Sequence, residues 1–136
     1  MIRENIFETN ISVLVNHLNY GNHLGYDSIL SIMQEARMRW LKSLDPKISE
    51  INIDNGTGWL VKKVELDITS EAEYSDILHV TLSIVTNKKS SFIISYKINN
   101  LSKNKPLCNG TTQQVCYHFS DSKVTRIPDL LIRAFG

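Results

Sequence analysis

The segment from residue 17 to residue 35 gathers the side chains with the most chemical capability. It contains Asn19, His23, Asp27 and Glu35. A histidine titrates near neutral pH and a carboxylate can accept a proton, so both types can act as a general base. An asparagine cannot accept a proton in this way, although it can orient a water molecule or bind a carbonyl group. These residue types suit acid–base chemistry at a positioned water.

A helix that would position these residues is predicted over residues 28–44. Apolar side chains recur there at helical spacing, at Ile29, Met33, Ala36, Trp40 and Leu44. Asp27 is a plausible N-cap of this helix, and the Asp45-Pro46 pair ends it because proline disfavours helical geometry in the preceding residue. Glu35 lies nearly opposite the apolar stripe, so it faces away from the helix's own sheet.

The rest of the chain has the pattern of an antiparallel sheet. A first strand is predicted over residues 6–15, and four longer alternating runs follow residue 57: GWLVKKVELDIT, DILHVTLSIVT, SSFIISYKIN and CNGTTQQVCYHF. The connections EAEYS, NKKS and NLSKNKP are short and polar, and a short helix is predicted over 128–135. One helix and one antiparallel sheet bury their apolar faces best on each other, which predicts an α+β domain.

Composition limits the possible classes of protein. The 136 residues predict a single domain, residues 1–136, and 15 basic against 14 acidic residues give a net charge of +1 without a basic field. We therefore expect no nucleic-acid partner. With no apolar leader and no run of roughly 18 apolar residues, we also expect no membrane span and a cytoplasmic location. The histidines have no metal-site spacing, so no metal is expected.

The order of elements resembles the hotdog fold, in which a five-stranded antiparallel sheet wraps a long central helix. Residues 17–26, HLNYGNHLGY, resemble the signature D-x-D-x-x-G-H-V-N-N of acyl-CoA thioesterases related to 4-hydroxybenzoyl-CoA thioesterase. The helix carries the family's E-A-R at residues 35–37. Further similar pieces are Y-S-D at 74–76, K-S-S-F at 89–92, G-T-T at 110–112 and R-I-P at 126–128. The resemblance covers nearly the whole chain.

The resemblance implies a specific chemistry at the start of the helix. In the family, free amides there polarise the thioester oxygen, and the matching amides belong to Gly25, Tyr26 and Asp27. Gly25 would let a ligand approach the backbone closely, although it could equally only shape a turn. The family's catalytic aspartate is replaced by Asn19, and the preceding aspartate by His17. Another group must therefore supply the base, or the protein binds thioesters without cleaving them efficiently.

Three residues are candidates for the missing base. His23 lies beside the proposed donors, and its alternative role is a hydrogen bond that anchors the loop. Asp27 could be a displaced carboxylate, and its alternative role is the N-cap. Glu35 could reach chemistry only across a subunit boundary, and a solvated or ion-paired surface glutamate is the simpler account. Arg37 is expected to make a structural pairing.

The remaining site residues follow from coenzyme A as part of the substrate, with no other cofactor. Lys88, Lys89 and Ser91 resemble the basic hairpin that binds CoA in the family, although a lysine pair in a turn is usually only solvated. Trp59 and Trp40 could contact the acyl group or belong to the core. The family's pocket lies between subunits, which implies a homodimer, with a homotetramer as the alternative.

The sequence supports one leading function and two alternatives. The leading one is an acyl-CoA thioesterase that positions water through Asn19, His23 and a nearby carboxylate. A hotdog hydratase or dehydratase would need His23 paired with Asp27 or Glu35. A non-catalytic module that binds acyl-CoA or an acyl carrier is favoured by Asn19 in place of aspartate.

Overall fold

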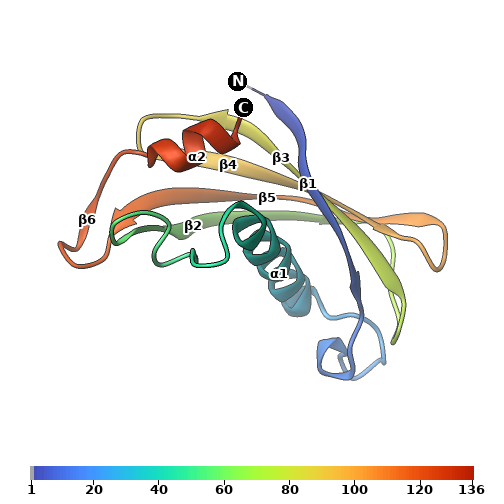
Figure 1. Cartoon of the computed structure of the whole chain (residues 1–136). Helices are drawn as coiled ribbons and strands as arrows, with labels where there is room; N and C mark the ends of the chain where they lie inside the picture. The colour runs from blue at the N-terminus through green and yellow to red at the C-terminus, as the bar shows by residue number, and fades with distance from the viewer. Residues whose placement is uncertain (1) are drawn as a thin grey trace.

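The computed structural model describes residues 2–136, with the backbone alone at positions 86 and 87. Its strands are β1 (Arg3–Ser12), β2 (Thr57–Ile68), β3 (Ile77–Asn87), β4 (Ser91–Asn100), β5 (Lys105–His118) and β6 (Lys123–Val124). Its helical segments are the 3₁₀ turn η1 (Val15–His17) and the helices α1 (Tyr26–Leu44) and α2 (Asp129–Ala134). The curved sheet wraps around α1, and α2 lies near the other end of the concave side (Figure 1).

The strands form one antiparallel sheet in the order β1-β3-β4-β5-β2, with β6 paired to the end of β5. The edges of this order are β1 and β2. The chain passes from β1 through α1 to the opposite edge, so α1 crosses the concave face and its first turn lies beside the end of β1 (Figure 1).

The predicted α+β architecture is confirmed, with differences at element boundaries. The sheet has six strands instead of five, because the two-residue β6 adds to it. The first strand covers Arg3–Ser12, earlier than the predicted residues 6–15. Helix α1 has 19 residues and begins at Tyr26 with Gly25 as its N-cap, so the prediction that Asp27 is the N-cap is wrong. Asp27 instead lies in the first turn, where a carboxylate interacts favourably with the helix dipole.

The core fills the space between α1 and the concave face of the sheet. The buried apolar residues of α1 are Ile29, Ile32, Met33, Ala36, Trp40 and Leu41. They meet alternate side chains of β3 and β4, and each large side chain buried in this way contributes about 1.5–3 kcal/mol. Trp40 stacks on Trp59 and on Phe135 of the C-terminal segment, at 6.3 Å between ring centroids in both pairs. Both tryptophans are therefore core residues of this chain.

A polar network crosses this core. The Arg37 guanidinium donates to Glu50 at 3.2 Å and to the Tyr96 hydroxyl at 3.1 Å. The hydroxyls of Tyr96 and Thr112 are hydrogen-bonded to each other, with 2.6 Å between the two oxygens. The Trp59 indole also donates to Glu50. Burial disfavours the charged guanidinium, but Tyr96 and Glu50 outweigh this effect and raise the pKa of Arg37. The structural pairing expected for Arg37 is present.

No helix among residues 2–136 combines the length and the apolar character that a bilayer crossing requires.

Candidate active site

The loop before α1 contains a tight turn built from two asparagines. Oδ1 of Asn19 accepts hydrogen bonds from the amides of Gly21 at 3.0 Å and His23 at 3.2 Å. Asn22 has φ of 60°, a left-handed conformation that asparagine tolerates better than most residues. Because Oδ1 of Asn19 is occupied by two donors, its side-chain Nδ2 is left as a hydrogen-bond donor. The turn thus fixes the orientation of this carboxamide.

The start of α1 carries two unpaired amides. The Gly25 N–H donates to the His17 carbonyl at 3.0 Å, so the expectation that Gly25 would be a donor for substrate is wrong. The N–H groups of Tyr26 and Asp27 have no hydrogen-bond partner among the described residues. Their helical position leaves them without an intrahelical acceptor, and Gly25 provides no capping side chain. These two amides can therefore bind an oxygen that carries negative charge.

The Asp27 carboxylate lies beside these amides, over Gly25. A Cβ atom built on Gly25 would be 2.5 Å from Oδ1 of Asp27 and 3.7 Å from Cβ of Asn19. Glycine at this position therefore makes room for the carboxylate. A hollow of about 310 Å³ is lined by Leu18, Asn19, Tyr20 and Asp27. The structure thus places Asn19 and Asp27 together on an open concavity.

His23 points toward a different partner. Its Nε2 lies 3.4 Å from the carboxylate of Glu71, in the connection between β2 and β3, and its backbone bridges to Glu73. Neither Asp27 nor Glu35 is its partner in the structure, although a hydratase would need one of those pairs. Glu71 was not among the predicted site residues. Its only sequence signal is its position just before Y-S-D at 74–76.

Glu35 lies outside the Asn19–Asp27 hollow. It accepts a hydrogen bond from Arg39 at 2.8 Å, and Arg39 also donates to Thr9 and to the Asn10 carbonyl at 2.8 Å. Glu35, Arg39 and His17 line a separate hollow of about 440 Å³ between β1 and α1. Glu35 is therefore an ion-paired residue on the β1 side of the helix.

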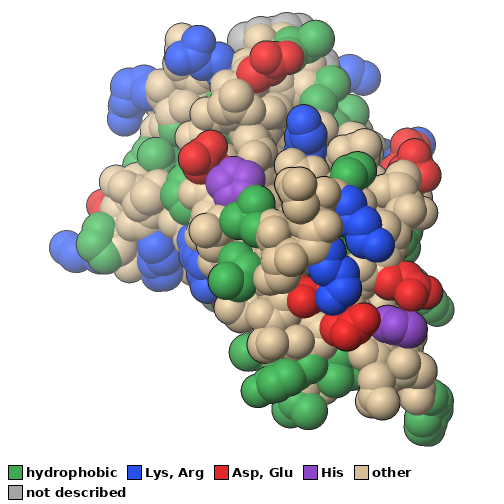
Figure 2. Space-filling model, turned by 90° about the vertical axis from the view of Figure 1, so that its right-hand side faces the viewer, with side chains coloured by type: hydrophobic (Ala, Val, Ile, Leu, Met, Phe, Trp, Pro, Cys, Tyr) green, Lys and Arg blue, Asp and Glu red, His purple; other side chains and the backbone are tan. Residues whose placement is uncertain are grey.

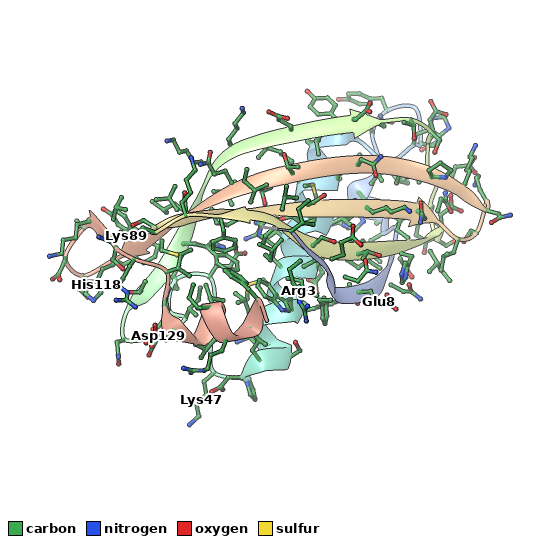
Figure 3. The ribbon with its side chains drawn as sticks, turned by 90° about the horizontal axis from the view of Figure 1, so that it is seen from above. Arg3, Glu8, Lys47, Lys89, His118 and Asp129 are labelled. Carbon is green, nitrogen blue, oxygen red and sulfur yellow. The ribbon has the colours of Figure 1, made fainter. Side chains whose placement is uncertain are left out.

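The predicted CoA-binding hairpin lies at the end of the sheet far from the Asn19–Asp27 hollow (Figure 3). Figure 3 shows Lys89 beside His118 at one end of the sheet, with Glu8 of β1 toward the other. Strand β3, which joins the 71–76 connection to this hairpin, has 11 residues and spans about 33 Å at ~3.3 Å per residue. Lys88, Lys89 and Ser91 therefore cannot reach the hollow at Asn19 within one chain.

Strand β2 leaves an apolar surface uncovered near the site. Its side chains Val61, Val64 and Ile68 pair with buried residues of β5, so they point to the concave face, yet they are 39–44% exposed. Tyr26 and Leu30 of α1 are exposed as well. Figure 2 shows hydrophobic side chains gathered at the lower end of the molecule, where Figure 1 places the loop before α1.

Other chemical features of the described residues lie elsewhere. A larger hollow of about 650 Å³ is lined mostly by polar side chains of β1, β3 and β4, including His79 and Lys97. Burial raises the pKa of the Cys116 thiol to about 12 and also raises that of Cys108, so neither forms a thiolate readily. Within residues 2–136, no group of three histidine, cysteine or acidic side chains is arranged to hold a metal.

Comparison with known proteins identifies the family. The sequence profile of the thioesterase-like superfamily matches residues 13–135. No protein in the curated set matches the chain.

Solved structures share the fold over nearly the whole chain. A 1,4-dihydroxy-2-naphthoyl-CoA thioesterase from Synechocystis superposes with a TM-score of 0.83 at 21% identity, over 95% of this chain and 94% of that one. A gentisyl-coenzyme A thioesterase gives 0.82 at 21% identity, over 96% and 100%. A hypothetical protein from Staphylococcus aureus, solved in complex with CoA, gives 0.82 at 13% identity, over 94% and 80%. At these identities the likeness shows the fold.

Proposed function

Since the chain belongs to the thioesterase-like superfamily, we propose that it hydrolyses acyl-CoA thioesters at the start of α1. The observation that carries this proposal is the pair of unpaired amides at Tyr26 and Asp27, directly beside the Asp27 carboxylate. Donors that are already fixed where negative charge develops lower the barrier to attack on a carbonyl group.

The proposed reaction uses four groups from three residues of this chain. The thioester oxygen accepts hydrogen bonds from the amides of Tyr26 and Asp27, which makes the carbonyl carbon more electrophilic. A water molecule lies between the Asp27 carboxylate and Nδ2 of Asn19. The water oxygen bonds to the carbonyl carbon while its proton passes to Asp27. The C–S bond then breaks, and the sulfur leaves as free CoA after taking that proton.

A second copy of the chain completes the proposed site. The exposed side chains Val61, Val64 and Ile68 lie on an edge strand with one unpaired side, and such an edge is normally covered. Antiparallel pairing of two β2 strands about a twofold axis would bring the Thr57 end of one beside the Ile68 end of the other. That arrangement carries the 88–91 hairpin of one copy toward the Asn19 hollow of the other, where it can bind the phosphates of CoA.

The oligomeric state provides a direct test of this arrangement. Val64→Glu places a charge on the apolar surface and is expected to give a folded monomer without activity. Light scattering measures the oligomeric state, and circular dichroism shows whether the protein is folded. Glu65→Lys, on the opposite face of β2, is the matched control and should remain a dimer. A Val64→Glu protein that stays dimeric and active would contradict pairing through β2.

A non-catalytic acyl-CoA-binding module is the second candidate, and Asn19 in place of the family's aspartate is the observation that favours it. The two candidates predict opposite results for Asn19→Asp. In a hydrolase that relies on Asp27, the new carboxylate removes the Nδ2 donor and repels Asp27, so activity falls. In a binding module, the same change supplies the missing base, so activity appears.

The deciding assay measures free thiol released from a panel of acyl-CoAs. The panel contains short, medium and long aliphatic acyl groups together with hydroxylated aromatic ones, because two structural neighbours are named for such aromatic substrates. The proposal predicts release by the unmodified protein and at least about a 100-fold loss in Asp27→Asn. Tight acyl-CoA binding without thiol release, on every member of the panel, would favour the binding module.

A further inference from the structure

A buried carboxylate lies directly before β3, in the connection that follows β2. Asp76 is only 7% exposed, and its Oδ2 accepts hydrogen bonds from the Glu73 amide, from Nδ2 of Asn100 and from Nζ of Lys103, each at 2.9 Å. Asn100 is fully buried. Burial alone would favour the neutral acid, but the Glu73, Asn100 and Lys103 donors outweigh it and hold the pKa of Asp76 below its usual value. Asp76 is therefore a buried, charged residue that is held by three hydrogen-bond donors.

The turn held by Asp76 is bonded to both ends of the loop that carries the site. The Leu24 amide donates to the Ala72 carbonyl at 2.8 Å. Val13 donates to the Asp76 carbonyl and accepts from the Ser75 amide, both at 2.9 Å. Ser75 has φ of 67°, a left-handed conformation that persists only where the surroundings enforce it. The loop thus begins at Val13 and ends at Leu24, and hydrogen bonds hold both of these residues against the same short turn.

Leu24 is the last residue before the helix cap, so its position, together with the bond from the Gly25 N–H to the His17 carbonyl, sets that of the amides that follow. A shift of the turn at 72–76 would move Leu24, and Gly25, Tyr26 and Asp27 would move with it. No other described segment offers Leu24 a backbone acceptor. Misplacement by about 1 Å far from the reacting atoms can slow catalysis by about 100-fold.

We propose that Asp76 is a positioning residue: through the turn at 72–76 it places the amides of Tyr26 and Asp27 against the thioester carbonyl. The inference rests on the proposed function. Asp76 touches no substrate and acts only through the Glu73 amide and through Asn100 and Lys103, the groups that face its carboxylate. Its loss should therefore lower kcat more than it raises KM.

The test compares Asp76→Asn with the exchanged pair Asp76→Asn/Asn100→Asp. The single variant sets an amide against the Asn100 amide, and kcat should fall by about 10- to 100-fold with a change in KM of less than about threefold. Exchange of the Leu24 amide with deuterium should become faster. The exchanged pair restores one amide and one carboxylate, and kcat should return to within about threefold of the unmodified protein.

Two further variants separate positioning from a general loss of stability. Ile94→Val removes one buried methylene from β4 without touching the turn, and it should leave kcat and Leu24 exchange unchanged at 25 °C. Lys103→Met keeps two of the three donors, so it serves if Asp76→Asn fails to fold, and it should show smaller changes in the same direction. An equal fall in kcat for Ile94→Val would overturn the proposal. So would unchanged kcat and Leu24 exchange in Asp76→Asn and Lys103→Met.

The exchange measurement also keeps this inference separate from the proposed function. If no acyl-CoA is hydrolysed but Leu24 exchange accelerates in Asp76→Asn, the hydrolase proposal and the positioning role of Asp76 in it fail together. The conclusion that Asp76 holds the turn at 72–76 would remain. If hydrolysis is observed and Leu24 exchange does not change, only the role of Asp76 fails.

Discussion

Asp27 and Arg37 both belong to α1, but the polar groups around them are buried to very different degrees. Around Arg37, the guanidinium, the Tyr96 hydroxyl and Thr112 are hydrogen-bonded to one another inside the core. Around Asp27, two backbone amides have no partner among the described residues, and the carboxylate borders an open hollow. The Arg37 cluster is buried, although Oε1 of Glu50 and Oε1 of Gln114 in it have no hydrogen-bond partner among the described residues. The same helix therefore carries one polar cluster that is buried and one that is open to solvent.

The two clusters should therefore serve different purposes, one for the stability of the fold and the other for chemistry. A buried charged network tolerates little change, because removing one member leaves another charged and unpaired. An open cluster contributes little to folding, but its free donors can bind a substrate oxygen. Variants around Arg37 should therefore change stability without changing the chemistry, and variants around Asp27 should do the reverse.

The largest effect is expected for Asp27→Asn. Loss of the general base should lower kcat by about 10²- to 10⁴-fold, whereas loss of charge in the first helical turn should cost only about 0.3–1 kcal/mol of stability. Thiol release and thermal unfolding measure the two quantities. If Asp27→Asn keeps its kcat, Asp27 is not the general base, and the two clusters do not differ in the way proposed.

Arg37→Met should give the opposite pattern. Breaking the buried pair leaves Glu50 without its cation, which should lower the free energy of unfolding by about 3–5 kcal/mol. Urea denaturation measures this loss, and kcat per folded molecule should stay within about threefold. The double variant Arg37→Met/Glu50→Leu removes both charges and should recover much of the stability. A stable Arg37→Met protein with reduced kcat would place Arg37 in the chemistry instead.

Gly25→Ala should have a smaller effect, and this effect should be on activity and not on stability. Its φ of −73° suits alanine, so the backbone is not strained, but the new Cβ would meet the Asp27 carboxylate. We expect kcat to fall by about 10-fold with stability within about 1 kcal/mol of the unmodified protein. In an Asp27→Ala background the same change should have no further effect on kcat. An undiminished effect there would mean that Gly25 acts on something other than Asp27.

The smallest effect is a pH dependence of stability that involves neither cluster directly. The pKa of Asp76 is lower in the folded protein than its ordinary value of 3.8. Its charged form therefore stabilises the fold fully above about pH 4, and this contribution is lost as the pH falls through the lower folded pKa. Asp76→Asn should flatten that decline in denaturation curves between pH 5 and 2. An unchanged slope would mean that other carboxylates cause it.

Much of the fold could be predicted from sequence because it depends on local pattern. The apolar spacing from Ile29 to Leu44 and the alternation in the later strands determine which faces are buried, and the α+β architecture follows. The start of α1 at Tyr26 could not be predicted from this local pattern. Gly25 is the N-cap, and the Asp27 carboxylate occupies the space that a Cβ atom would take there, a contact that residue types alone do not reveal.

The site was predictable only in part, because pairing of backbone groups depends on distant segments. The sequence placed Asn19, Tyr26 and Asp27 in one corner, but not the bond from Gly25 to the His17 carbonyl. His23 lies near Glu71 because an intervening segment of nearly fifty residues brings the 71–76 connection back to this loop. The roles of Lys88 and Lys89, the homodimer, the tetramer alternative and the cytoplasmic location stay predictions.

The central claim is that the unpaired amides at the start of α1 bind the thioester oxygen. Its most direct test is a titration with a non-hydrolysable ketone analogue of the best acyl-CoA substrate, followed by amide resonances in NMR spectra. The account predicts that the Tyr26 and Asp27 amide protons move downfield more than any others, as expected for new hydrogen bonds to the ketone oxygen. Binding that leaves both resonances unchanged would contradict it.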